Sequence, residues 1–255
     1  MKTSLMIIGD ELLRNEREDL NAHFVISKLK KKHLYLNKLL LTGDSEASVK
    51  EGLLFLIAYS DVLITSGGLG LTPDDITLVT VSKTLGKPLV KDKTVQCYVL
   101  NSLKKIRQQA NKNYIERMSY AIEGAIPIKN EIGVSPGMHL KITNKHLFIL
   151  PGVPQEFNAM FTQYVLPLLT SGKRVFEKAF FVPLKESDLV DFLEMLETKY
   201  KIKTASYPPI FKNSFLKIKL MGEKESVNKA VKCFKVFLKS KGIKLKKDNQ
   251  DKKDL

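Results

Sequence analysis

Residues 65–75 read TSGGLGLTPDD, and this stretch decides the fold that the sequence predicts. It follows directly on an apolar run at residues 62–65, and a segment of helical period starts at Val79. A short buried strand that turns through glycines into a helix is typical of a parallel α/β sheet, in which ligands bind at the carboxyl ends of the strands. We therefore expect the glycine-rich loop to lie at a ligand-binding edge.

Segments of strand and helix character alternate on both sides of this loop. Strands are predicted at residues 5–8, 34–41, 62–65, 125–128, 138–142 and 146–150, and helices at residues 21–31, 47–59, 79–85, 95–109, 114–121 and 155–169. This order predicts a three-layer α/β domain over residues 1–170, with helices on both faces of a mainly parallel sheet.

A second, smaller domain is predicted over residues 171–241. Its strands are expected at residues 179–182, 204–207 and 215–220, and its helices at residues 186–200 and 224–239. The resulting βαββα order is that of a small α+β sandwich with one open face. Residues 242–255 have too little apolar content to fold and are expected to form a flexible basic tail.

The composition indicates a folded protein with a basic surface. Hydrophobic residues make up 44% of the 255 residues, and the formal net charge is +15. Because the lysines are spread along the whole chain, they favour a solvated surface over a nucleic-acid patch. No run approaches the roughly 20 apolar residues that span a bilayer, and the first residues lack a signal-peptide core. We expect a cytoplasmic homo-oligomer that binds a small molecule and has no nucleic-acid or membrane partner.

The glycine-rich loop is the first candidate site. Gly67, Gly68 and Gly70 permit positive φ and a close approach of ligand, so that backbone N–H groups can face phosphate oxygens. The alternative is a tight connection in which the glycines satisfy only backbone geometry and an aspartate caps the next helix. Asp74 and Asp75 favour the binding site, because hard divalent cations prefer carboxylate oxygens and bridge to phosphate.

Polar residues also follow the first two predicted strands. Asp44, after Gly43, opens on the same carboxyl edge and can add a carboxylate to the site, or cap the next helix. Glu11 and Asn21 occupy the corresponding place after the first strand and can reach a ribose or a metal. Surface or capping roles are the alternatives for both.

Five motifs together resemble one known family. They are IGDELL at residues 8–13, LTGD at 41–44, TSGGLGLTPDDIT at 65–77, GVSPGM at 133–138 and LPGVPQEF at 150–157. In order and approximate spacing they resemble the N-terminal domain of the competence/damage-inducible protein A (CinA) family, which is related to the molybdopterin-binding domains of molybdenum-cofactor enzymes. The second domain resembles the KH-like domain of that family, without a GxxG loop that clamps RNA. We expect no third, amidohydrolase domain.

The resemblance implies a function. Members of the family hydrolyse ADP-ribose or related nucleotide pyrophosphates with a divalent metal (magnesium, manganese or cobalt) and often potassium. Matched position by position, it implies catalytic roles for Asp75, Asp44 and Asp74, and metal ligands at Asp44, Asp75 and Glu156. The implied ligand-binding residues are Gly67, Gly68, Leu69, Gly70, Thr72, Thr77, Asn21, Glu11, Gly137, Gly152 and Pro154.

The sequence departs from the family pattern at several positions near the expected pocket. Leu71 stands where the family usually has proline, and Val79 where it has glutamate. Ile115 and Met118 replace an Asn…Gln pair. Loss of an acid and two polar groups leaves two hypotheses open, a metal-dependent nucleotide pyrophosphatase and a non-catalytic binder of a nucleotide or molybdopterin-type phosphate ligand.

Overall fold

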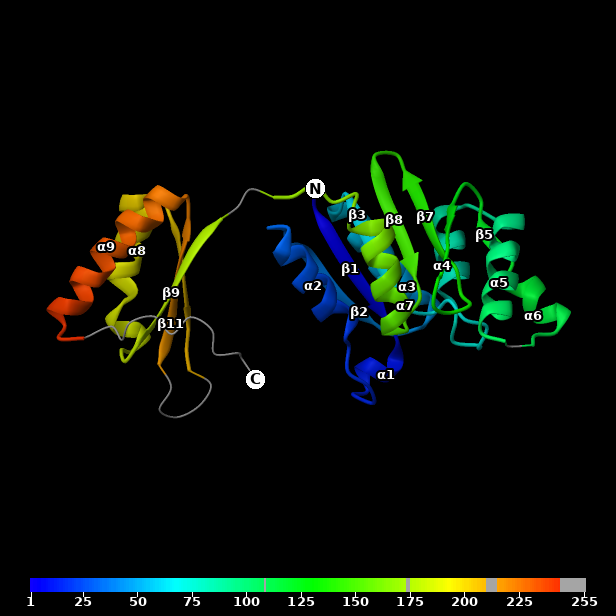
Figure 1. Ribbon diagram of the computed structural model, residues 1–255, viewed down its shortest axis with the longest axis horizontal. Helices are drawn as coiled ribbons and strands as arrows, with labels where there is room; N and C mark the ends of the chain where they lie inside the picture. Colours follow the sequence, from blue (N-terminus) through cyan, green and yellow to red (C-terminus); the bar gives the residue numbers. More distant parts are fainter. Residues whose placement is uncertain (108, 173–174, 210–214, 244–255) are drawn as a thin grey trace. The chain divides into compact units, whose positions relative to one another are not determined.

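The computed structural model describes residues 1–107, 109–172, 175–209 and 215–243. The chain divides into two compact units, Met1–Gly172 and Lys173–Leu255, which are coloured along the sequence in Figure 1. The sequence placed the boundary after residue 170. Apart from Gly242 and Ile243, the expected tail at residues 242–255 lies outside the described residues.

A six-stranded, mainly parallel sheet forms the centre of the first unit, in the order β2-β1-β3-β8-β7-β6. Its strands are β1 (Thr3–Ile8), β2 (Leu36–Thr42), β3 (Val62–Ser66), β6 (Ile126–Ile128), β7 (Gly137–Ile142) and β8 (Lys145–Leu150). β2, β1, β3 and β8 run parallel, whereas β7 is antiparallel to both of its neighbours. The predicted fold class is confirmed.

Burial explains the sequences of these strands. Every residue of β1 and of β3 is buried, because helices cover both faces at the centre of the sheet. Along β2, at the edge, burial alternates instead. Four parallel strands therefore end at one carboxyl edge, with the predicted glycine-rich loop following β3.

The helices lie on both faces of the sheet (Figure 1). They are α1 (Asp10–Leu13), α2 (Asn21–Lys31), α3 (Glu46–Tyr59), α4 (Thr77–Leu85), α5 (Lys93–Lys105), α6 (Lys112–Arg117) and α7 (Pro154–Met160), which continues as a π-helix over Phe161–Val165. One core includes Leu53 of α3 and Val81 of α4. A separate core includes Val25 of α2 and Phe157 of α7. These two cores make the three layers.

The structure differs from the prediction around α6. A two-stranded antiparallel sheet joins β4 (Leu89–Lys91) to β5 (Tyr120–Ile122). The helix expected over residues 114–121 ends at Arg117. Ala121 instead belongs to β5, where it pairs with Val90. The two cysteines are free: Cys97 of α5 is exposed, and Cys233 is partly buried.

The second unit has the predicted βαββα order. Its elements are β9 (Phe176–Val182), a 3-10 turn (Glu186–Asp188), α8 (Val190–Tyr200), β10 (Lys203–Tyr207), β11 (Leu216–Gly222) and α9 (Lys224–Ser240). The strands form an antiparallel sheet in the order β10-β11-β9. Its core joins Ile218 of β11 to Leu196 of α8 and Phe234 of α9. In neither unit does a described helix have the length and apolar character needed to cross a membrane.

The hydrophobic clusters of the two units share no residue. A substitution in the core of one unit should therefore lower the free energy of unfolding of that unit. Phe234 is fully buried in α9, whereas Val236 on the same helix is 69% exposed. We expect Phe234→Ala to destabilise the second unit by about 3–5 kcal/mol and Val236→Ala by less than about 0.5 kcal/mol. Scanning calorimetry measures both, and equal effects of the two variants would contradict the described core.

Candidate functional site

The loop after β3 is held so tightly that two of its positions have no space for a side chain. Gly67 has φ of 113°, and a Cβ atom there would lie 2.3 Å from the carbonyl oxygen of Ile8, at the end of β1. Gly68 has φ of 68°, and its Cβ would lie 2.1 Å from Thr77 Oγ1. Both the backbone conformation and the packing therefore require glycine.

Thr77 joins this loop to the start of α4. Its hydroxyl donates to the carbonyl oxygen of Gly67 over 2.9 Å, and its N–H donates to that of Gly68 over 3.2 Å. The side chain is fully buried. Thr77, predicted to bind ligand, thus uses its hydroxyl to close the loop.

Asp75 orders the outer part of the loop. Its Oδ2 accepts hydrogen bonds from the backbone N–H and the hydroxyl of Thr72, the first over 2.9 Å. A Cβ at Gly70 would lie 2.3 Å from the same oxygen, so the carboxylate lies against the loop backbone. Among the described residues Oδ1 accepts no side-chain or backbone hydrogen bond. One oxygen of Asp75 positions the loop, and the other is free for a ligand.

Asn21, the first residue of α2, connects the loop to the segment after β8. Its Nδ2 donates to Ser66 Oγ and to the carbonyl oxygen of Gly152, each over 2.9 Å. The side chain is 4% exposed, and its Oδ1 has no hydrogen-bond partner among the described residues. A buried acceptor without a partner is costly in a folded protein.

Two carboxylates lie beside each other after β1 and β2. The N–H of Asp10 faces Asp44 Oδ2 at 3.5 Å, and the N–H of Asp44 faces Asp10 Oδ1 at 3.4 Å. Arg14 binds Asp10 with an Nη2–Oδ2 distance of 2.7 Å and compensates one of the two charges. Asp44 therefore remains the less neutralised carboxylate of this pair.

Glu156 of α7 is half-buried beside Asn130, a residue that the sequence did not single out. Asn130 Nδ2 donates to Glu156 Oε2 over 2.6 Å and to the carbonyl oxygen of Ser135 over 3.0 Å. Asn130 Oδ1 accepts from the N–H groups of Ile132 and Gly133. Burial raises the pKa of Glu156, while the hydrogen bond from Asn130 works in the opposite direction. Asn130 was missed because only the folded chain places it against Glu156.

These groups surround a cavity of about 630 Å³, here called the large cavity. The predicted site residues that line it are Glu11, Asn21, Asp44, Gly67, Gly68, Leu69, Gly70, Asp74, Asp75, Gly152, Pro154 and Glu156. Thr72, Thr77 and Gly137 do not line it. Gly137 packs in the core, where a Cβ would lie 2.7 Å from Met160 Cε. Within the described chain, no three His, Cys, Asp or Glu side chains gather closely enough to hold a metal ion by themselves.

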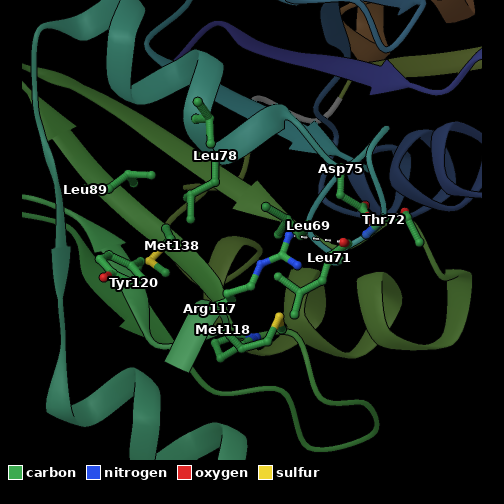
Figure 2. Close-up of a pocket in the computed structure, with 14 residues that line it drawn as sticks. Leu69, Leu71, Thr72, Asp75, Leu78, Leu89, Arg117, Met118, Tyr120 and Met138 are labelled. Atoms are coloured by element: carbon green, nitrogen blue, oxygen red, sulfur yellow. Dashed lines mark hydrogen bonds between the residues drawn. The ribbon is translucent and has the colours of Figure 1, made fainter. Parts of the chain in front are cut away.

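A second hollow of about 220 Å³, here called the small pocket, shares the wall formed by Gly68, Leu69, Gly70 and Asp75. Figure 2 shows Leu71, Met118, Tyr120 and Met138 around it, together with Arg117. The Nη2 of Arg117 lies 3.4 Å from the carbonyl oxygen of Leu71.

Four residues were noted above as differing from the pattern of the CinA family, and three of them line this small pocket. They are Leu71, Val79 and Met118. The fourth, Ile115, packs against the core of the first unit. These three side chains give the small pocket an apolar wall, whereas the large cavity has a polar and acidic lining.

Comparison with known proteins relates the first unit to one family. Residues 4–171 match the family described as "Probable molybdopterin binding domain". A protein of Pyrococcus furiosus is 33% identical over 255 residues, covering 95% of this chain and 98% of that protein. The CinA-like protein of Thermosipho melanesiensis is 32% identical over 239 residues, covering 92% of this chain and 58% of the relative.

A solved structure shows a similar arrangement. The protein CinA from Thermoplasma acidophilum, described as having unknown function, matches with a TM-score of 0.60 at 26% identity. The match covers 66% of this chain and 98% of that one.

Gly86 provides a matched control for the packing of the glycine-rich loop. Its φ of 64° is close to that of Gly68, but a Cβ at position 86 would meet nothing within 4 Å. Alanine at either position costs about 1–2 kcal/mol of backbone strain. We expect Gly68→Ala to lose at least about 2 kcal/mol more, because it must displace Thr77. Urea unfolding followed by circular dichroism measures the difference, and equal losses would refute the tight loop.

Proposed function

Because the chain belongs to the family of probable molybdopterin-binding domains, we propose that its large cavity binds a nucleotide pyrophosphate such as ADP-ribose and hydrolyses it with a divalent cation. The main support is the glycine-rich loop, whose backbone lines a cavity of about 630 Å³ that also carries acidic side chains. A backbone cradle for phosphate beside carboxylates is the combination that pyrophosphate hydrolysis needs.

The backbone of the glycine-rich loop and the residues around it can contact the phosphates and the ribose of the nucleotide. The N–H of Gly67 donates to the carbonyl oxygen of Leu150 over 3.1 Å. The N–H groups of Gly68, Leu69 and Gly70, which line the large cavity, are therefore the ones that can face a phosphate. Asn21 also lines the cavity, at a place where a ribose next to the phosphates would lie. The large cavity and the small pocket share the loop as a wall, so one ligand can place its phosphates in the first and a ring in the second.

The acidic residues can hold a divalent cation together with the phosphates of the substrate. A site built only from protein ligands is absent from the described residues, but Mg²⁺ is usually held by one or two carboxylates together with substrate phosphates. Asp75 Oδ1 and Asp44 are the groups available for this role. A divalent cation held there would neutralise phosphoryl oxygens and lower the pKa of a bound water.

A non-catalytic binder is the second candidate, and one observation favours it. Leu71, Val79 and Met118 bring apolar groups to the small pocket, where the resembled family carries an acid and a polar side chain at two of the three positions. Such a pocket can still hold a ligand ring next to the phosphate loop. Potassium dependence and a homo-oligomeric state remain proposals for either function.

The discriminating experiment separates the charge of Asp75 from its structural role. Asp75→Asn keeps an oxygen that can accept from Thr72 but removes the charge, whereas Thr72→Val removes one hydrogen bond and keeps the carboxylate. We expect ADP-ribose with Mg²⁺, Mn²⁺ or Co²⁺, with and without potassium, to release AMP. The rate should fall at least about 100-fold in Asp75→Asn and less than about tenfold in Thr72→Val.

The matched control is Asp191→Asn, which removes an exposed carboxylate in the second unit and should leave the rate unchanged. Chromatography of the products measures the rate, and calorimetry measures binding. Tight binding of ADP-ribose without AMP release under any of these conditions would reject hydrolysis and leave the binder.

The raised pKa of Glu156 leads us to expect that the hydrolysis rate depends on pH. Its raised pKa keeps the side chain protonated to a higher pH than an exposed glutamate. If it donates a proton to the leaving phosphate, the rate should fall as pH rises through that pKa, and Glu156→Gln should remove this limb of the profile. Glu131→Gln is the control, since the Lys129 ammonium lowers the pKa of that exposed carboxyl. An unchanged profile in Glu156→Gln would exclude Glu156 as the proton donor.

A further inference from the structure

The sheet of the second unit has one face covered by helices and one open face. α8 and α9 lie on the same side of the sheet (Figure 1). The side chains of Phe180, Ile218 and Leu220 belong to the core between the sheet and these two helices. Because side chains alternate along a strand, the neighbouring positions point to the opposite face. That face carries Phe181 and Tyr207, which are 59% and 48% exposed.

The strand register places these two rings in one row. Lys217 of β11 pairs with Tyr207 of β10 on one side and with Phe181 of β9 on the other. Adjacent strands lie about 4.8 Å apart, so the two rings flank a lysine across a span on the order of 10 Å. In the next row Lys219 lies between Ala205 and Ala179, two small residues that leave the centre of the face flat.

The lysines of this face lie close to the rings. Lys217 Nζ is 5.5 Å from the centroid of the Phe181 ring, and Lys219 Nζ is 5.9 Å from that of Tyr207. Lys219 also pairs with Glu177 at 3.6 Å. Between residues 173 and 255 the sequence contains 21 lysines and arginines against 11 aspartates and glutamates. The second unit therefore carries most of the net positive charge of the chain.

We propose that this open face, defined by Phe181, Tyr207, Lys217 and Lys219, binds single-stranded nucleic acid. Exposed aromatic rings interleaved with cationic groups allow bases to stack while the lysines contact phosphates. This mode uses the sheet surface and does not require the GxxG loop whose absence argued against RNA binding in the sequence. It is independent of the large cavity in the first unit.

The chemistry of the face favours this partner over a second copy of the chain. A symmetric contact through the same face brings the lysines of one copy towards those of the other, and such like charges repel. An acidic peptide would satisfy the lysines but gives no role to two rings exposed in one row. Unpaired bases linked by phosphates match both features.

The test measures binding of the full-length protein to a fluorescein-labelled ten-nucleotide single strand of RNA by fluorescence anisotropy. We expect Phe181→Ala with Tyr207→Ala to weaken binding at least about tenfold, and Lys217→Gln to reduce the slope of log affinity against log salt by about 0.7. Both aromatic side chains are exposed, so these variants should fold, which thermal unfolding checks.

Matched controls use residues of the same types elsewhere. Lys235→Gln, an exposed lysine on α9, and Tyr35→Ala, a 67% exposed tyrosine in the first unit, should leave RNA binding unchanged. Asp75→Asn should also leave it unchanged, so that failure here and failure of the proposed hydrolysis are distinguishable. The proposal is overturned if the wild type does not bind the strand, if the double variant binds equally well, or if sedimentation shows that the double variant dissociates a dimer.

Discussion

The site in the first unit depends on the absence of two side chains. Gly67 passes against the carbonyl oxygen of Ile8 and Gly68 against the hydroxyl of Thr77, at distances that no Cβ can occupy. The same threonine donates back to Gly67. This packing joins the ends of β1 and β3 to the start of α4, and it turns the loop backbone towards the large cavity. Asp75 is hydrogen-bonded to the same loop through Thr72, and Asn21 connects it to the segment after β8 through Ser66 and Gly152.

The central sheet could be predicted from the sequence because buried strands consist of apolar residues. β1 and β3 are covered on both faces and read as uninterrupted apolar runs. The pair β4 and β5 could not be predicted in this way. Each strand has three residues and forms only by pairing with the other, so the local pattern around Ala121 resembled a continuation of the preceding helix.

The site was predicted where it depends on strand order and missed where it depends on packing. The carboxyl ends of parallel strands bring Asp44, Asn21 and the glycine-rich loop to one cavity, as their places in the sequence indicated. The contact between Asn130 and Glu156 joins residues 26 positions apart, and the pattern offered no sign of it. Leu71, Val79 and Met118 were noticed singly, but only the structure gathers them in one pocket.

The central claim is that the loop backbone in the large cavity holds the phosphates of a nucleotide. The most direct measurement is a crystal structure of the full chain with a methylene analogue of ADP-ribose, in which the bridging oxygen is replaced so that hydrolysis is blocked. The account predicts both phosphorus atoms beside the backbone of Gly68, Leu69 and Gly70, with a ribose hydroxyl near Asn21. An analogue bound away from this loop would contradict it.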